Sequence, residues 1–496
     1  MTEFEINNKI YKIHFSGYFF ACNELVNNDK KLISFLINSD IKKLGIISLI
    51  NYFSLLSGSW TIILESEDQV IAAVDRVRSR PLYYKKINKK IIVSNLIQDI
   101  RLKNIFKTNQ ISIKYYKKNK ISPPGKTLDN NIMVIRPGSY IYFKNGCLFE
   151  NQYYETPVPF CNEINPSIES SKATLLKSLE NLYFYLKKFP SKNIYIPLSG
   201  GMDSRLIAAF LSKKEDLRKR IYLYTYGNNK YNEDTKISKA VAKELKLNWV
   251  FVEYSRKMWK DLRTNFINDV MDHFPYEFCV PNLQEYFSVD YLTNSFGKGI
   301  FLPGYFLDLP AGCYICPDEL SLISKFFRGY SKEFRTNSKV QDWYRDFIEN
   351  RLSYVLRSCE WFQNKGCDFY LPYIDNNILD YWFSINAHNK KERIHFKEVI
   401  RSIYHELNPE LNNIKYTENF FKYGLVRNEV YGLKSIVKQF ISKNNLEFVL
   451  NIFKSKKRIY DYLGVYNITF KNEFEHSESH YNDIVKSIVL SKINKK

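Results

Sequence analysis

The sequence predicts a protein of mixed α/β and α+β class with two domains, and three observations lead to this prediction. The chain of 496 residues has room for roughly two to four domains. Its first 155 residues hold short β-prone runs, whereas strand and helix patterns alternate after residue 190. Between these parts, the stretch YETPVPFCNEINPS contains three prolines and no periodicity, which is typical of a linker. We therefore expect a β-rich domain over residues 1–157 and an α/β domain over residues 165–496.

Strand-like runs dominate the N-terminal part. Examples are GSWTIILES, QVIAAVDR and KKIIVSN, which are rich in β-branched and aromatic residues. Farther along, Asn145-Gly146 separates two more such runs, and this dipeptide favours a tight hairpin. Helical patterns are sparse, so we expect a sheet-dominated sandwich.

The C-terminal part is predicted to be a doubly wound parallel sheet with additional helices. An amphipathic helix over ESSKATLLKSLENLYFYLKKF precedes the strand NIYIPLS. A helix over residues 203–213, the strand RIYLYTYG, the helix NEDTKISKAVAKELKL and the strand NWVFVEY then alternate, as in parallel sheets that bind ligands at their carboxyl edge. Later, FYLPYI reads as a strand and residues 318–450 as mainly helical.

The string Ser-Gly-Gly-Met-Asp-Ser joins a strand to a helix at residues 199–204. Two glycines there allow unusual backbone angles and close ligand approach, and the helix N-terminus offers N–H groups to an anion. No Gly-Lys-Ser/Thr follows, so this is not a Walker loop. The string resembles the pyrophosphate-binding loop of ATP pyrophosphatases. That resemblance implies ATP as a substrate, and implies that one set of residues surrounds its pyrophosphate: Leu198, Ser199, Gly200, Gly201, Asp203 and Ser204.

Other candidates follow neighbouring predicted strands. Thr225 stands where a nucleotide base would meet the backbone at a strand end. Glu233 and Asp234 begin the next helix, where they are equally explained by stabilisation of the helix dipole. In GIFLPGYFLDLPAGCYI, Gly304 marks a turn and is followed by Asp308.

Carboxylates at strand ends that face a phosphate loop suit Mg²⁺, which takes few protein oxygens and keeps phosphate oxygens as ligands. We therefore expect Asp203 and Asp308 to bind Mg²⁺.

Together these motifs resemble the asparagine synthetase family. The C-terminal pattern continues with Gly304-x-x-x-Asp308 and Asp368-x-x-x-Pro372-x-x-Asp375. The N-terminal segments LLSGSWTIILES and VIAAVDRVRSRPLYYKK are similar to that family's class II glutamine amidotransferase domain. The resemblance implies an enzyme that adenylates a carboxylate, releases AMP and pyrophosphate, and forms an amide.

Three positions depart from the family pattern. Thr2 stands where the glutaminase nucleophile is Cys, so we expect a degenerate amidotransferase domain and ammonia from solution or from a partner. Leu309 replaces a usual Glu after Asp308, and Asp368 is one methylene shorter than the Glu that the family uses near the amine. Asp368 is still the candidate for orienting or deprotonating the amine.

A lysine near residue 415 is a candidate for stabilising charge in the transition state. We favour Lys415, with Lys422 as the other choice; the alternative is that both lysines only solvate a helix end.

Composition restricts location and partners. The net charge of +21 comes from scattered lysines in an Ile-, Asn- and Tyr-rich chain, which favours genomic A/T bias over nucleic-acid binding. Eight irregularly spaced cysteines, without an N-terminal apolar leader, indicate a cytoplasmic protein with reduced thiols. The lone pair Cys313 and Cys316 favours packing over metal or redox work. No apolar run is long enough to span a membrane.

The substrate is inferred from resemblance alone. The stretches PGYFLDLPAGCYI and CDFYLPYIDNNILDYWFSI look like a branch associated with bacterial surface polysaccharides, which implies amidation of a sugar-linked carboxylate. Two alternatives stay open. One is an intramolecular amide ligase, similar to β-lactam synthetases or lasso-peptide cyclases, which would act on a peptide or small-molecule carboxylate. The other is a tRNA-modifying ATP pyrophosphatase.

Overall fold

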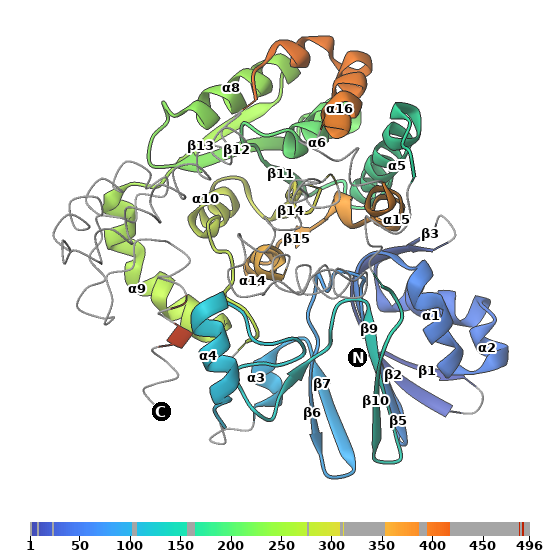
Figure 1. The fold of residues 1–496 in the computed structure, drawn as a ribbon. Coiled ribbons are helices and arrows are strands. Elements are labelled where there is room, and N and C mark those ends of the chain that lie inside the picture. The colour runs from blue at the N-terminus through green and yellow to red at the C-terminus, as the bar shows by residue number, and fades with distance from the viewer. Residues whose placement is uncertain are drawn as a thin grey trace, which may run out of the picture.

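The structure, a computed structural model, combines one parallel sheet with two antiparallel sheets (Figure 1). It describes residues 2–6, 9–21, 24–101, 107–155, 164–274, 277–307, 311, 353–385, 394–416, 486 and 489–490. Three groups of predicted residues lie outside these ranges: Asp308 with Leu309, Lys422, and the pair Cys313 and Cys316.

A seven-stranded antiparallel sheet forms the centre of the N-terminal half. Its order is β1-β2-β4-β5-β9-β10, and β3 pairs with β2. The strands are β1 (Thr2–Ile6), β2 (Lys9–Ala21), β3 (Glu24–Val26), β4 (Ser57–Glu65), β5 (Gln69–Val74), β9 (Ser139–Lys144) and β10 (Cys147–Gln152). The predicted hairpin is confirmed: Asn145 and Gly146 link β9 to β10 with φ of 51° and 81°, the positive angles of a two-residue hairpin turn.

The seven-stranded sheet is covered on both faces. A three-stranded sheet packs on one face, in the order β7 (Lys90–Ser94), β6 (Tyr83–Ile87), β8 (Met133–Val134), with Leu82 and Tyr84 buried against Val70 and Ala72. The other face carries α1 (Asp29–Asn38), α2 (Ile41–Leu44) and the 3-10 helix η1 (Ile46–Leu55). Two further helices are α3 (Ile97–Ile100) and α4 (Gln110–Asn119).

The expectation of sparse helices is therefore wrong for residues 29–55. The signal for α1 was present in the sequence, because Asn28 caps the helix and Leu32 and Leu36 recur at helical spacing on its buried face.

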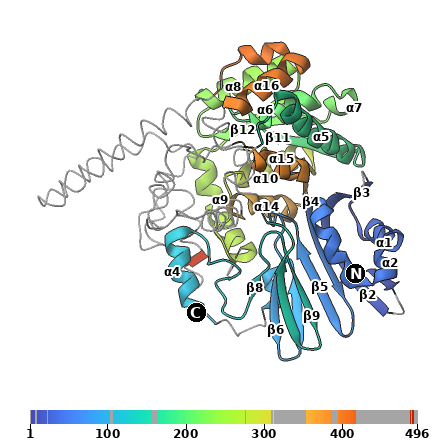
Figure 2. The same cartoon turned by 45° about the vertical axis from the view of Figure 1, so that its right-hand side comes forward.

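The C-terminal half is built on a five-stranded parallel sheet (Figures 1 and 2). Its order is β13 (Asn248–Glu253), β12 (Ile221–Gly227), β11 (Asn193–Pro197), β14 (Gly299–Phe301), β15 (Asp368–Phe369). The chain adds strands first on one side of β11 and then on the other. The strand order therefore reverses at β11, and the carboxyl edge between β11 and β14 is where sheets of this kind bind ligands.

Helices surround this sheet, and the predicted alternation over residues 168–256 is confirmed. They are α5 (Ile168–Lys187), α6 (Asp203–Leu211), α7 (Glu215–Arg218), α8 (Glu233–Leu245), α9 (Arg256–His273), α10 (Tyr286–Phe296), α13 (Ser353–Leu356), α14 (Ser358–Asn364), η3 (Pro372–Ile374), α15 (Asn376–Ser384), α16 (Ile394–Leu407) and η5 (Pro409–Asn413). Where residues 318–450 are described, they are mainly helical, as expected. The predicted strand FYLPYI is shorter than expected, because Pro372 cannot donate a ladder hydrogen bond and starts η3 instead.

The two halves share buried side chains. One apolar cluster contains Tyr83 and Leu128 from the N-terminal half together with Ile196, Leu206 and Trp361 from the C-terminal half. The boundaries 1–157 and 165–496 therefore stay a prediction.

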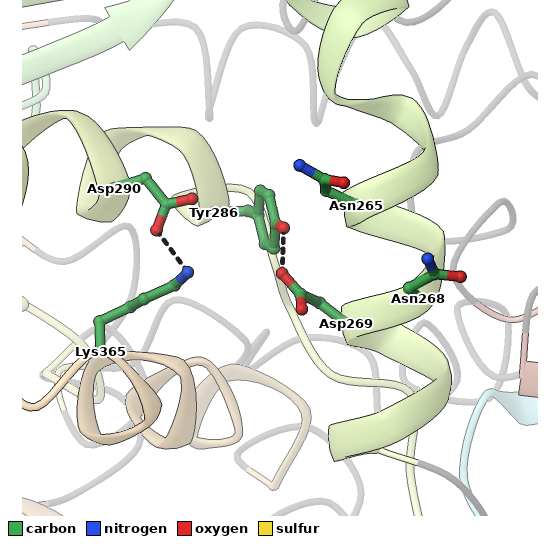
Figure 3. Close-up of a pocket in the computed structure, with 6 residues that line it drawn as sticks. All are labelled: Asn265, Asn268, Asp269, Tyr286, Asp290 and Lys365. Carbon is green, nitrogen blue, oxygen red and sulfur yellow. Dashed lines mark hydrogen bonds and ion pairs between the residues drawn. The ribbon is translucent and has the colours of Figure 1, made fainter.

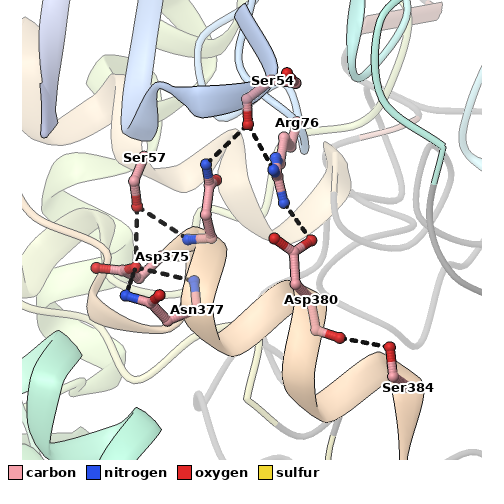
Figure 4. Close-up of polar contacts among 8 residues, drawn as sticks. Ser54, Ser57, Arg76, Asp375, Asn377, Asp380 and Ser384 are labelled. Carbon is pink, nitrogen blue, oxygen red and sulfur yellow. Dashed lines mark hydrogen bonds and ion pairs between the residues drawn. The ribbon is translucent and has the colours of Figure 1, made fainter. Parts of the chain in front are cut away.

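A polar clasp also joins the halves, and we use this name for Ser54, Ser57, Arg76, Asp375, Asn376 and Asp380 (Figure 4). The Ser57 hydroxyl donates to Asp375 at 2.9 Å and accepts from the Asn376 N–H at 2.9 Å. Arg76 donates to the Ser54 carbonyl at 2.6 Å and to the Asp380 carboxylate at 2.5 Å.

No helix in the described ranges has the length and apolarity that a membrane span requires.

Candidate active site

The predicted loop, residues 198–202, connects β11 to α6 at the carboxyl edge where the strand order reverses. Ser199 is exposed, and its hydroxyl accepts from the Gly201 N–H at 3.2 Å. Neither Gly200 nor Gly201 has a positive φ. The expectation of special backbone angles at these glycines is therefore wrong, and the space they leave for a close ligand is the remaining reason for them.

Four side chains from four different elements donate hydrogen bonds to carbonyl groups of residues 198–203. The donors belong to β12, α6, η3 and α16, so the main-chain path of the loop is fixed from several sides. The pairs are Thr225 Oγ1 with Leu198 (2.7 Å), Arg205 Nη2 with Gly200 (3.4 Å), Tyr404 Oη with Met202 (3.3 Å) and Tyr373 Oη with Asp203 (2.7 Å).

This arrangement orients the N–H groups of the same peptide units. A peptide unit is planar and trans, so its N–H points away from its carbonyl. The N–H groups of Ser199, Gly201, Asp203 and Ser204 therefore point away from the four donors. Two of them, those of Asp203 and Ser204, belong to the first turn of α6, where main-chain N–H groups lack partners within the helix and attract anions. The loop is thus suited to hold an anion.

Gly304 lies against the first turn of α6. A Cβ at this position would lie 2.8 Å from the Ser204 nitrogen and 3.3 Å from the Asp203 carbonyl carbon. The first distance is closer than real Cβ atoms allow and the second is tight, so a residue larger than glycine would push the chain after β14 away from the loop. Gly304 thus lies beside the loop, and its predicted part in cofactor binding stays a prediction.

The segment that carries Gly304 is anchored by a buried carboxylate. Tyr305 donates to Glu285 at 2.6 Å, and Tyr224 donates to the second oxygen of the same carboxylate. Burial raises the pKa of Glu285, while the two hydroxyl groups lower it. These bonds connect the chain after β14 to β12, and so help to set the distance between Gly304 and α6.

The two acids at the start of α8 are Glu233 and Asp234, and Asp234 contacts the loop. Asp234 accepts from the Gly200 N–H at 3.1 Å, so its carboxylate holds the loop in place. The helix itself is capped by Asn232, whose side chain accepts from the Thr235 N–H at 2.7 Å. Asp234 therefore has a contact with the loop, in addition to the stabilisation of the helix dipole that explains acids at this position.

Asp368 is not brought to the loop. It opens β15 level with Ile300 and Ile194, at the amino edge of the parallel sheet, and it forms an ion pair with Lys192. From Ile194 to Leu198 the strand rises about 13 Å. The proposed amine-side role of Asp368 stays a prediction, and this placement gives it no support.

Asp375 and Thr2 both make structural hydrogen bonds. Asp375 is buried, caps α15 and accepts from Asn181 at 2.6 Å as well as from the clasp. The Thr2 hydroxyl donates to Asp29 at 2.9 Å, which ties β1 to α1.

Sequence reasoning missed Arg205, Tyr373 and Tyr404. Arg205 carried a signal, because it is a charged residue inside the apolar helix sequence DSRLIAAFL. It donates to the carbonyls of Ile414 at 3.0 Å and Lys415 at 2.9 Å, and so brings Lys415 next to the loop, while the Lys415 side chain is exposed. The two tyrosines carried no such signal, because tyrosine is frequent throughout this chain.

The metal site is tested only in part. Asp203 lies in the first turn of α6, where a carboxylate could hold Mg²⁺ beside an anion in the loop. Within the ranges that the structure describes, no cluster of three or more His, Cys, Asp or Glu side chains could bind a metal ion. The pair Asp203 and Asp308 remains a prediction.

A polar cavity of about 310 Å³ lies elsewhere, among α9, α10 and α14 (Figure 3). Tyr286 donates to Asp269, and Lys365 pairs with Asp290 at 2.9 Å. Burial raises the pKa of Asp290, and the Lys365 ammonium lowers it. Lys365 is the C-cap of α14, shortly before β15 starts at Asp368, so this cavity lies toward the amino edge of the sheet and not at the loop.

Comparison with known proteins identifies part of the chain. Residues 192–281 match the family model described as asparagine synthase. This segment contains the loop, the central strands and the start of α8. A search of curated proteins gives no match.

Solved structures give distant likenesses. An NH3-dependent NAD synthetase from Campylobacter jejuni, in complex with nitrate, is 14% identical, with 43% of this chain and 95% of that chain covered and a TM-score of 0.22. The allosteric regulatory enzyme of purine biosynthesis is 11% identical, with 50% and 62% covered and a TM-score of 0.21. The glutamine phosphoribosylpyrophosphate amidotransferase from B. subtilis, in complex with ADP and GMP, is 9% identical, with 62% and 59% covered and a TM-score of 0.20. These TM-scores are too low for a shared overall fold to be inferred.

Proposed function

Residues 192–281 belong to the asparagine synthase family, and on this premise we propose that the protein is an ATP-dependent, amide-forming ligase. It adenylates a carboxylate, releases AMP and pyrophosphate, and transfers the acyl group to ammonia or an amine. The observation that carries the proposal is the loop at residues 198–203, whose carbonyls are held by four donors and whose N–H groups point away from them.

The residues of the loop fit a pyrophosphate group. Main-chain N–H groups of Ser199, Asp203 and Ser204 would bind its oxygens, and the lack of a side chain at Gly304 avoids crowding the Ser204 nitrogen. Bound Mg²⁺ would neutralise phosphate charge, with Asp203 and Asp308 as its protein ligands. Because the four donors fix the loop's main chain before the ligand binds, its N–H groups cost little reorganisation during the reaction.

We assign a role in adenylation to Lys415 by its position, and we assign the substrate by resemblance. Lys415, next to the loop, would stabilise charge on the phosphate during adenylation. As the substrate we propose a sugar-linked carboxylate of a bacterial surface polysaccharide, on the sequence stretches that resemble that branch. The alternative within the same chemistry is an intramolecular amide ligase, in which the amine belongs to the substrate itself.

The test uses the exchange of labelled pyrophosphate into ATP, with a uronic acid such as glucuronic acid and with peptide carboxylates as acceptors. We expect AMP and pyrophosphate in equal amounts, and a loss of roughly 100-fold in exchange rate for Asp203→Asn. Glu215→Gln is the matched control, because Glu215 is an exposed acid in the first turn of the next helix, α7. Formation of ADP and phosphate with the true acceptor would contradict the proposal.

A further inference from the structure

Arg205 is a fully buried arginine whose partners are neutral. Its side chain lies in the first turn of α6 and has an exposed fraction of 0%. Buried guanidinium groups usually pair with carboxylates. No such ion pair forms within the described ranges, where Arg205 instead donates to main-chain carbonyls. Burial lowers its pKa, yet arginine keeps its charge in proteins.

The guanidinium joins two segments that are more than 200 residues apart. Nη2 donates to Gly200 of the loop at 3.4 Å and to Lys415 at 2.9 Å, and Nη1 donates to Ile414 at 3.0 Å. The ring of Tyr416 lies 4.5 Å from the guanidinium carbon, within cation–π distance. Residues 414–416 are therefore held by Arg205 through two carbonyls and one ring.

Among the described residues, Arg205 is the side chain that donates hydrogen bonds both to the loop and to residues 414–415. Residues 414–416 follow η5, and α16 packs against α6 (Figure 1). Tyr404 of α16 reaches the loop at Met202, ten residues before Ile414. Although α8 and α16 also contact η5, the guanidinium is the direct hydrogen-bonded link between the loop and Lys415 among the described residues. A lysine at position 205 could not replace the arginine. Its single ammonium group cannot reach three carbonyls in two directions, as the planar guanidinium does.

We propose that Arg205 is a positioning residue that holds Lys415 beside the loop, within reach of the phosphates of a nucleotide bound there. The proposal rests on the proposed function, because it requires ATP at residues 198–203. It adds that Arg205 places the exposed ammonium of Lys415 by holding the main-chain carbonyl of Lys415. Contacts of the Lys415 side chain are not needed for this placement.

An ATP analogue with an acyl group on its terminal phosphate tests this proposal. When the analogue binds, a lysine amine near the phosphates attacks the acyl carbon, forms an amide and releases ATP. Peptide mass spectrometry of the full-length protein then shows which lysines are acylated. In the unchanged protein we expect Lys415 to be acylated, and excess ATP to suppress the reaction.

Arg205→Met is the test variant and Arg220→Met its matched control. Arg220 also donates to three main-chain carbonyls, those of Leu186, Phe189 and Lys192, but at the amino edge of the sheet. Because Arg205 also holds the Gly200 carbonyl, Arg205→Met is compared with the unchanged protein at analogue concentrations that saturate each, and we expect it to lose at least tenfold of the Lys415 acylation there. Arg220→Met should keep that acylation. If Arg205→Met does not fold, Tyr416→Ala, which removes the stacked ring, is expected to reduce acylation in the same direction.

The outcomes separate this proposal from the proposed function. Equal acylation of Lys415 with and without Arg205 overturns the positioning role, and so does ATP-dependent acylation that misses Lys415 in the unchanged protein. Failure of the unchanged protein to bind ATP overturns the proposed function, and the positioning role with it. Loss of Lys415 acylation in Arg205→Met at saturating analogue supports the proposal, since a defect in nucleotide binding alone would be overcome by saturation.

Discussion

At the residue scale, the distance between Gly304 and Ser204 leads to a prediction that the loop motif alone would not give. A Cβ at Gly304 would meet main-chain atoms of α6 at 2.8 Å, whereas a Cβ at Gly201 would meet only the movable Ser199 hydroxyl at 3.2 Å. We expect Gly304→Ala to weaken pyrophosphate binding at least tenfold and Gly201→Ala by much less. Isothermal titration with pyrophosphate measures both. A larger loss for Gly201→Ala would show that the close approach at Gly304 is not what keeps the loop open.

The candidate residues differ in how far the sequence could predict them. The loop, Thr225 and Gly304 were predicted from strand ends and one motif, and the structure places them together because carboxyl ends of parallel strands share an edge. Only the order of motifs indicated that Asp368 belongs to the site. The pairing of β15 with β14 places Asp368 at the amino edge of the sheet, opposite the loop. Arg205, Tyr373 and Tyr404 act through main-chain carbonyls of distant residues, and such contacts leave no spacing in the sequence.

At the scale of elements, the alternation of strands and helices in the C-terminal half was predictable, whereas places that depart from the surrounding pattern were not. The strands β11, β12 and β13 and the helices α6 and α8 follow from apolar periodicity and caps. Of the helices over residues 29–55, α1 carried a capping residue and helical spacing that were overlooked, whereas α2 and η1 have no side-chain cap that would mark their starts.

One ion pair between elements carries a stability prediction. Arg357 at the start of α14 donates to Glu277 at 2.6 Å, and both side chains are at most 4% exposed. Burial raises the pKa of Glu277, and the guanidinium opposes this rise. Arg357 also pairs with Glu360, so Arg357→Met removes the guanidinium from both carboxylates and should lower the free energy of unfolding by about 3–5 kcal/mol at neutral pH. Adding Glu277→Gln should recover part of this loss. Lys365→Met, which removes a half-exposed pair with Asp290, should cost under about 1 kcal/mol.

The same variant has a defined pH dependence. Without Arg357 the folded-state pKa of Glu277 rises further above its unfolded value of about 4.3, so the folded state binds a proton more tightly than the unfolded state. The stability of Arg357→Met should therefore be greatest near pH 4.5 and decrease as the pH rises, relative to the double variant. Urea unfolding at pH 5 and pH 8 measures the difference. A loss that grows toward low pH would contradict this assignment.

At the scale of the whole molecule, the N-terminal half is bound firmly to the proposed synthetase half. The clasp joins β4 to α15, and Tyr18 stacks on Tyr370 at 4.3 Å between ring centroids while accepting from the Leu371 N–H at 2.9 Å (Figure 4 shows the clasp). Together with the shared apolar cluster, these contacts give the half a structural role that does not require glutaminase activity.

Nitrogen supply is the last prediction, and it depends on Thr2. The Thr2 hydroxyl donates to Asp29, and no thiol stands at this position, so the N-terminal half should not hydrolyse glutamine. We expect no glutamate release from glutamine, AMP formation with ammonium salts, and the same rates in Thr2→Ala. Thr2→Val, which keeps the shape and removes the hydroxyl, controls for the bond to Asp29. Glutamate release that Thr2→Ala abolishes would restore a working amidotransferase. AMP formation with no added amine, and a product one water lighter than its acid, would instead favour the intramolecular ligase, because the substrate then supplies its own nitrogen.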